Sequence, residues 1–118
     1  MKKITLLLIP IFLILITSCS KEPENGSAVI WYGEFTAENL IDDGANSLIY
    51  TIGGEIAGST STSTYYVIAP SCGDNASITY TNQPGSYTYT VEDQTGFLYW
   101  TGTINLTEAG CYALELTW

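Results

Sequence analysis

Three cysteines carry the most reactive side chains of this chain, and their surroundings differ. Cys19 follows a long apolar run, whereas Cys72 and Cys111 lie in polar, turn-rich sequence. A cysteine thiolate can act as a nucleophile, as a metal ligand or as one half of a disulfide. The chain contains no histidine, so it lacks the base that a Ser-His-Asp or Cys-His nucleophile requires. Two cysteines without a histidine also do not complete a standard zinc site.

The balance of charge excludes further classes of function. Twelve residues are Asp or Glu, and the only cations are Lys2, Lys3 and Lys21. From Glu22 onward the chain therefore has no cation to neutralise a phosphate, as a nucleic-acid-binding protein or a nucleotide-handling enzyme must. We expect no nucleic acid among its partners. A strongly acidic domain instead attracts cationic partners.

Carboxylates remain as candidate catalytic or metal-binding groups. Two of them hydrolyse a glycosidic bond only if a cleft holds them about 5–9 Å apart. The available glutamates fall at the ends or outward faces of expected strands: Glu34, Glu55, Glu92, Glu108 and Glu115. Residues 42–46 (DDGAN) offer some of the oxygen ligands of a calcium loop, but Gly44 occupies a ligand position. We interpret them as an acidic, solvated turn and expect neither a cofactor nor enzymatic activity.

The N-terminal segment explains the setting of Cys19. Lys2 and Lys3 precede an apolar stretch over residues 4–16, and small residues follow it. This order is the layout of a secretory signal peptide, and the stretch is shorter than the roughly 20 residues of a membrane-spanning helix. The sequence Ile16-Thr17-Ser18-Cys19 resembles the lipobox of bacterial lipoproteins, which signal peptidase II recognises.

The lipobox resemblance implies cleavage before Cys19, a diacylglycerol thioether on its sulfur and a further acyl chain on its new amino group. More than one acyl chain holds a protein stably on a membrane, at ~0.8 kcal/mol per buried methylene. We therefore expect residues 1–18 to be a signal peptide and residues 19–27 to be a lipidated cysteine with a polar tether.

The residues that follow Cys19 refine the expected location. Ser20 is not the aspartate that retains lipoproteins in the inner membrane of enteric bacteria, which favours the outer membrane. Residues 21–24 (KEPE) resemble the charged export tags of surface lipoproteins in Bacteroidota, although Pro23 interrupts the pattern. We expect an outer-membrane lipoprotein of the cell envelope, and the tag points to the cell surface.

The two remaining cysteines form an even pair in an oxidising compartment. A disulfide between Cys72 and Cys111 would close a loop of about 40 residues, which restricts the unfolded chain by about 4 kcal/mol on the chain-entropy account. For so small a domain this is a large share of the total stability. We therefore predict a Cys72–Cys111 disulfide.

From residue 28 onward apolar and polar residues alternate, which is typical of β-strands. The spacing of these segments, about 8–14 residues, predicts an all-β fold for residues 28–118: a small antiparallel β-sandwich of about seven or eight strands. The expected strands are 28–35, 47–54, 55–60, 64–69, 76–80, 85–93, 97–106 and 111–118. Gly53-Gly54, residues 82–85 and residues 93–96 are the predicted turns. For residues 36–47 we expect at most a single helical turn.

Alternation also predicts which side chains are buried. The expected core residues of the first, seventh and last of these strands are Val29, Trp31, Phe35, Leu98, Trp100, Gly102, Ile104, Leu106, Tyr112, Leu114, Leu116 and Trp118. Phe97, Tyr99 and Thr101 then face outward. Flat rings beside hydroxyls suit a sugar face or a protein hot spot, so these three residues form the candidate binding patch unless another part of the chain covers them.

The order of segments adds a second resemblance. "YTIGGEIAG", "PGSYTYTVED" and "WTGTINLTEAGCYALELTW" are similar to the succession of elements in PEGA-like and transthyretin-like surface modules. Where such modules continue with Thr-Pro, this chain has "GSTSTSTYYVIAPSC", in which we expect a flexible edge, an added strand and Cys72. The resemblance implies a binding or scaffold module and supplies no catalytic residues.

Two functions are compatible with these expectations. One is a lipid-anchored module of the cell envelope with a binding or structural role, in contact with a glycan or a neighbouring outer-membrane protein. The other is an acidic inhibitor or immunity-type protein that neutralises a basic enzyme such as a lysozyme.

We predict that Cys19 carries lipid and that Cys19→Ala leaves an unprocessed precursor, because the lipobox cysteine is the only acceptor for the thioether. Labelling of cells with an alkyne fatty acid, followed by blotting, measures this. A mature protein without label, or equal labelling of the Cys19→Ala variant, would contradict the prediction.

Overall fold

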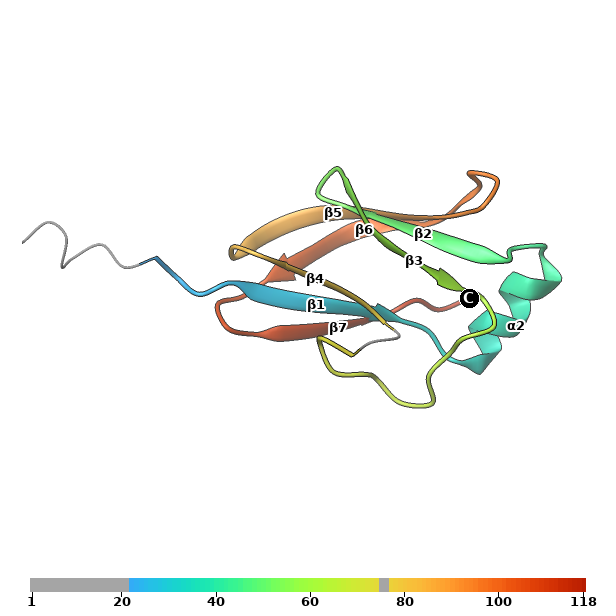
Figure 1. Ribbon diagram of the computed structural model, residues 1–118, viewed down its shortest axis with the longest axis horizontal. Coiled ribbons are helices and arrows are strands. Elements are labelled where there is room, and N and C mark those ends of the chain that lie inside the picture. The colour runs from blue at the N-terminus through green and yellow to red at the C-terminus, as the bar shows by residue number, and fades with distance from the viewer. Residues whose placement is uncertain (1–21, 75–76) are drawn as a thin grey trace, which may run out of the picture.

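Seven strands and one helix make up the part of the chain that the structure, a computed structural model, describes, namely residues 22–74 and 77–118. The strands form two facing sheets, and the helix lies across one end of them (Figure 1). The elements are β1 (Gly26–Trp31), α2 (Glu34–Asp42), β2 (Ser47–Ile52), β3 (Glu55–Ser61), β4 (Ile78–Asn82), β5 (Gly85–Asp93), β6 (Leu98–Leu106) and β7 (Cys111–Glu115). The predicted all-β sandwich is confirmed.

Strand β1 is the middle strand of the smaller sheet, whose order is β4-β1-β7, and the larger sheet has the order β3-β2-β5-β6. All neighbouring strands are antiparallel except β1 and β7, which run parallel from Ser27 beside Cys111 to Trp31 beside Glu115. The parallel pair departs from the expected antiparallel arrangement. The parallel pairing follows from the path of the chain. After β6 in the larger sheet the chain crosses to the smaller sheet, and β7 lies there beside β1 in the same direction.

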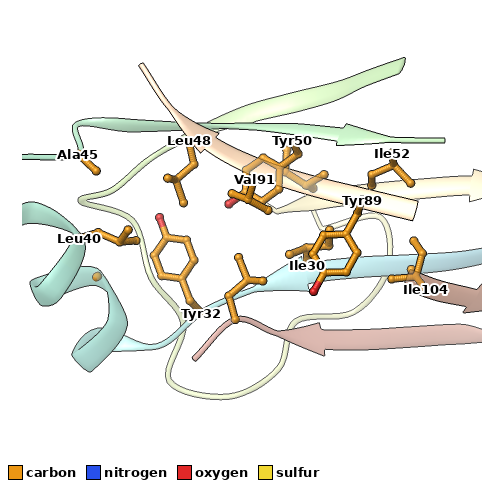
Figure 2. Close-up of a cluster of buried hydrophobic side chains, with 14 of the residues drawn as sticks. Ile30, Tyr32, Leu40, Ala45, Leu48, Tyr50, Ile52, Tyr89, Val91 and Ile104 are labelled. Atoms are coloured by element: carbon orange, nitrogen blue, oxygen red, sulfur yellow. The ribbon is translucent and has the colours of Figure 1, made fainter. Parts of the chain in front are cut away.

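A single apolar layer between the sheets forms the core (Figure 2). Its fully buried members include Leu48, Tyr50 and Ile52 on β2, Val91 on β5 and Ile104 on β6. Burying each large apolar side chain stabilises the fold by about 1.5–3 kcal/mol.

Two tyrosines in this layer, Tyr32 and Tyr50, form hydrogen bonds through their hydroxyl groups. The Tyr50 hydroxyl lies 2.9 Å from the Thr60 hydroxyl, and the Tyr32 hydroxyl donates to the carbonyl oxygen of Ser61 at 3.1 Å. Burial raises the pKa of both tyrosines. Both hydroxyls thus reach the edge strand β3, and the core tyrosines tie that edge to the sandwich.

Helix α2 is longer than the single turn expected from the sequence. It buries Thr36, Ala37 and Leu40, whose spacing places them on one helical face, and Leu40 points into the core (Figure 2). The prediction that Phe35 is buried in the first strand is wrong, because β1 ends at Trp31 and Phe35 lies on the outer face of α2 with 67% of its surface exposed.

The predicted strand at residues 64–69 is also wrong. Residues 62–74, which follow β3, form a loop, and Val67 within it is 89% exposed. This part of the chain passes from β3 in the larger sheet to β4 in the smaller one and pairs with neither sheet as a strand. Its attachments to the rest of the fold include the bond from the Tyr66 amide to the Tyr32 carbonyl oxygen and the Cys72–Cys111 disulfide, which is confirmed.

The predicted turns are all present. Gly53 and Gly54 join β2 to β3 with φ angles of 62° and 87°, a backbone conformation that favours glycine at both positions. The β3 strand that follows them is an edge strand of its sheet, as the hydroxyl-rich residues near its end suggest.

At the last strand the burial prediction holds in part. Leu116 is buried and Leu114 is half-buried, but Tyr112 and Trp118 are exposed. They are exposed because β7 is an edge strand and Trp118 lies beyond its end.

Cys19 and the predicted signal peptide lie outside the described residues. Within the described ranges, α2 is the one helix, and it is too short and too polar to cross a bilayer.

We predict that Cys72→Ala lowers the melting temperature strongly. The bridged residues are 39 positions apart, and losing a disulfide across such a loop lowers the free energy of unfolding by about 4 kcal/mol. At ~4–8 °C per kcal/mol for a domain of this size, calorimetry of oxidised protein should show a fall of at least about 15 °C. Equal melting temperatures for the variant and the wild type would contradict the prediction.

Candidate functional site

A β-bulge in β6 shapes the surface at the helix end of the sandwich. Trp100 pairs with Val91, but the next pair along the strands is Leu98 with Glu92, so Tyr99 is an extra residue without a partner. A bulge changes the face on which the following side chains lie. It explains why Leu98 is exposed, contrary to the burial expected from simple alternation.

The turn between β5 and β6 is held by the buried Asp93. Its Oδ1 accepts hydrogen bonds from the Thr95 amide at 2.8 Å, the Thr95 hydroxyl at 2.7 Å and the Phe97 amide at 3.0 Å. The Thr95 hydroxyl, followed by the backbone amides, lowers the pKa of the Asp93 carboxyl. This turn fixes the backbone from which the Phe97 ring projects.

Two further contacts fasten the bulge and the turn to helix α2. The Tyr99 hydroxyl donates to Asp43 Oδ2 at 2.5 Å, at the C-terminal cap of the helix. The Gln94 side chain accepts from the Asn46 amide at 2.9 Å and donates to the Gly44 carbonyl oxygen at 3.0 Å. The surface around Tyr99 is therefore cross-linked to the helix rather than free to move with the turn alone.

The residues after β7 complete this surface. Leu116 is buried, and its amide donates to the Trp31 carbonyl oxygen at 2.8 Å. Trp100 Nε1 donates to the Thr117 carbonyl oxygen at 3.0 Å. These bonds place Trp118 next to Tyr99, with 6.0 Å between the ring centroids.

The result is a shallow pocket of about 240 Å³ lined by Tyr99, Trp100, Thr117 and Trp118. Phe97 does not line the pocket but packs edge-on against Tyr99, with 4.9 Å between the ring centroids. We call these five residues the aromatic groove. Phe97 and Trp118 are 57% and 53% exposed, so the groove presents ring faces to solvent.

The candidate patch predicted from the sequence is thus present only in part. Phe97 is exposed and Tyr99 is half-buried, and the two lie in contact. Thr101 is exposed but pairs with Thr90 on the outer face of the sheet, and it does not line the pocket. Sequence alternation placed Tyr99 beside Thr101, and the bulge instead turns Tyr99 toward Trp100 and Trp118.

Sequence reasoning missed Trp118 and Trp100 as surface residues, as well as the supporting role of Gln94. Both tryptophans sit at apolar positions of an alternating pattern, which predicts burial. The signal that could have found Trp100 was the preceding turn. Asp93 and Gly96 favour a hairpin with a bulge beside the turn, and a bulge breaks the simple alternation of buried and exposed residues.

Two carboxylates, those of Asp43 and Asp93, act on Tyr99 of the aromatic groove. Burial and the neighbouring Asp43 carboxylate raise the pKa of Tyr99 to about 12, with a smaller effect from Asp93. No Lys, Arg or His occurs among residues 22–118. The groove therefore offers ring faces, carboxylate oxygens and carbonyl oxygens, but no positive charge.

The described residues do not gather a metal-binding cluster. No group of three or more His, Cys, Asp or Glu side chains there is placed to hold an ion. The acidic turn expected at residues 42–46 is the C-terminal end of α2 and the link to β2, and Asp43 within it accepts the Tyr99 hydrogen bond.

A scan against protein-family models finds no match to this chain, and neither a search of curated proteins nor a search of solved structures finds one.

We predict that Tyr99→Phe destabilises the domain at neutral pH by about 0.5–1 kcal/mol, the contribution of an exposed hydrogen bond to a carboxylate. The pKa of Tyr99 is raised in the fold, so this contribution is complete below pH ~10 and is lost as the pH rises from ~10 toward ~12. Melting temperatures of both proteins at pH 8 and pH 11 test this. A gap at pH 11 as large as the gap at pH 8 would contradict the assignment.

Proposed function

We propose that this protein is a non-enzymatic, lipid-anchored module of the bacterial outer envelope that binds a neutral glycan in the aromatic groove. The observation that carries the proposal is the group of aromatic rings at the helix end of the sandwich, held in place but open to solvent.

The shape of the groove supports a sugar ligand. Small-molecule sites are concave and mostly apolar, with a few polar groups that fix orientation. Here the rings of Tyr99 and Trp118 stand beside the Asp43 carboxylate and the Thr117 backbone. A pyranose ring has an apolar face that can lie on such rings, and hydroxyl groups at its edge that can donate to these oxygens.

The charge of the domain narrows the class of glycan. Twelve acidic residues and no basic residue lie between Glu22 and Trp118. A uronic acid or a sulfated polysaccharide would be repelled by this field. The ligand that fits is neutral.

The position of the groove suits a protein held at its N-terminal side. Residues 22–25 leave β1 at the end of the sandwich opposite α2 (Figure 1). The groove lies at the α2 end, because Tyr99 bonds to the cap of that helix. A lipid anchor on Cys19 would leave the groove facing away from the membrane.

A second candidate function is an acidic inhibitor or immunity-type protein that neutralises a basic enzyme. The observation that favours it is the absence of any Lys, Arg or His in residues 22–118, which hold all twelve acidic residues of the chain. Such a field accelerates association with a cationic protein and weakens steeply with salt.

The chain has three tryptophans, so ¹⁵N-tryptophan labelling of the full chain in a non-ionic detergent gives one indole NMR signal for each. We predict that a panel of neutral hexasaccharides of glucose, mannose and xylose contains a ligand that shifts the signals of Trp100 and Trp118 but not that of Trp31. Trp118→Ala should weaken this binding at least about tenfold, the loss of one stacking contact of ~1.4 kcal/mol.

Phe35→Ala is the matched control, because Phe35 is an exposed aromatic residue on α2 that does not line the groove. It should bind as the wild type does. Absence of any shift with the whole panel, together with salt-sensitive binding of a basic lysozyme, would replace the glycan function with the inhibitor function.

A further inference from the structure

A second pocket lies on the outer face of the smaller sheet, under the loop that joins β3 to β4. The loop covers this face, as the burial of Val29 shows: Val29 alternates with Ala28 and Ile30, which belong to the core, yet it is fully buried. The disulfide from Cys72 to Cys111 at the start of β7 fastens the far part of the loop. The near part is fastened by the Tyr66 amide, which donates to the Tyr32 carbonyl oxygen at 3.0 Å.

This pocket has a volume of about 230 Å³ and draws its walls from four parts of the chain. Trp31 and Glu115 are paired residues at the ends of the parallel strands β1 and β7. Glu34 is the first residue of α2, and Tyr65 and Tyr66 come from the loop. Three aromatic rings and two carboxylates therefore line one small cavity.

The chemistry of these walls selects a positively charged group. The faces of Trp and Tyr rings attract a cation through their quadrupoles, with Trp the strongest. Glu34 and Glu115 add negative charge, and no Lys, Arg or His in residues 22–118 is available to neutralise it. An anionic or purely apolar occupant would leave these two carboxylates uncompensated beside it.

The size of the pocket limits what enters. Pockets that hold a whole drug-sized molecule measure about 300–1,000 Å³, and this one is smaller. Its volume suits a single ammonium or guanidinium group with its alkyl stem, which is the dimension of a Lys or Arg side chain.

We propose that the pocket formed by Trp31, Glu34, Tyr65, Tyr66 and Glu115 binds the cationic side chain of an arginine or lysine presented by a basic protein. The carboxylates accept hydrogen bonds from the cation, and the rings of Trp31 and the two tyrosines cover its faces and stem. The acidic surface of the domain draws the basic partner toward the pocket. This site shares no residue with the aromatic groove and does not depend on the glycan function.

The ¹⁵N-tryptophan-labelled full chain in non-ionic detergent tests the proposal directly, because Trp31 lines this pocket whereas Trp100 and Trp118 line the groove. Titration with Nα-acetyl-arginine methylamide should shift the Trp31 indole signal saturably, at a concentration on the order of millimolar for so small a probe. The citrulline analogue, which has the same shape without the charge, should leave all three signals in place. A decapeptide of alternating arginine and serine should bind at least ten times more tightly than the single residue, as expected if the cation arrives on a protein chain.

The double variant Glu34→Gln, Glu115→Gln should raise the midpoint of the arginine titration at least about tenfold. The control variant Glu55→Gln, Glu92→Gln makes the same change of net charge outside the pocket and should raise it less than about twofold. Unchanged Trp100 and Trp118 signals report that each variant is folded.

Three results would overturn the proposal: a Trp31 signal that does not move with the arginine probe, an equal shift with the citrulline analogue, or equal weakening by the two double variants. Binding of the single residue without any gain from the decapeptide would assign the pocket to a free organic cation and overturn the protein partner. None of these results bears on the glycan titration, whose reporters are Trp100 and Trp118.

Discussion

Leu48, Tyr50 and Val91 pack against Ile30 across the space between the two sheets, and this one apolar layer holds the domain together. A sandwich with so few strands cannot close its own ends. Helix α2 covers one end by inserting Leu40 into the core. The residues after β7, which we call the C-terminal tail, cover the core beside it with Leu116. The aromatic groove at that end is joined to both, through the bond from Tyr99 to Asp43 at the end of α2 and the bond from Trp100 to Thr117.

Each of the two pockets lies where a segment of the chain packs over the edge or the outer face of a sheet. The groove lies where the bulged edge strand β6 meets the tail after β7, and its Trp100 serves both the core edge and the surface. The other pocket lies where the long loop crosses the outer face of β1. In the groove the Trp100 indole donates to the Thr117 carbonyl oxygen and the Tyr99 hydroxyl donates to Asp43, and in the other pocket the Tyr66 hydroxyl donates to Asp74 Oδ1. Rings held in this way lose little conformational entropy when they bind.

Much of the framework followed from the sequence, because it depends on local chemistry. Gly53-Gly54 predicts a tight hairpin through backbone conformation alone, and Cys72 with Cys111 predicts a disulfide once Cys19 is assigned elsewhere. Period-two alternation predicted the burial of Ile104 and Leu106 correctly. These features require no knowledge of which strands are neighbours.

The candidate site was less accessible to sequence reasoning, because it depends on long-range placement. One unpaired residue at Tyr99 reverses the face of Leu98, and no local pattern marks that position. The helix went unrecognised at its true length since Phe35 and Ile41 lie exposed and blur its apolar face. The apolar residues at 64–69 suggested a strand, but this segment lies in the passage from β3 to β4, between the two sheets, and a local pattern does not show that.

The place of β1 in its sheet has a consequence for the order in which the domain forms. Among the described strands β1 comes first in the sequence, yet it is the central strand of its sheet, and its two neighbours are β4 and β7. β7 is the last strand in the chain. Contacts between such distant segments form slowly, because the entropy of closing a long loop is lost before the contacts stabilise the fold. When β1 through β6 have been made, β1 therefore still lacks one of its two neighbouring strands. The smaller sheet is complete only after β7 has been added.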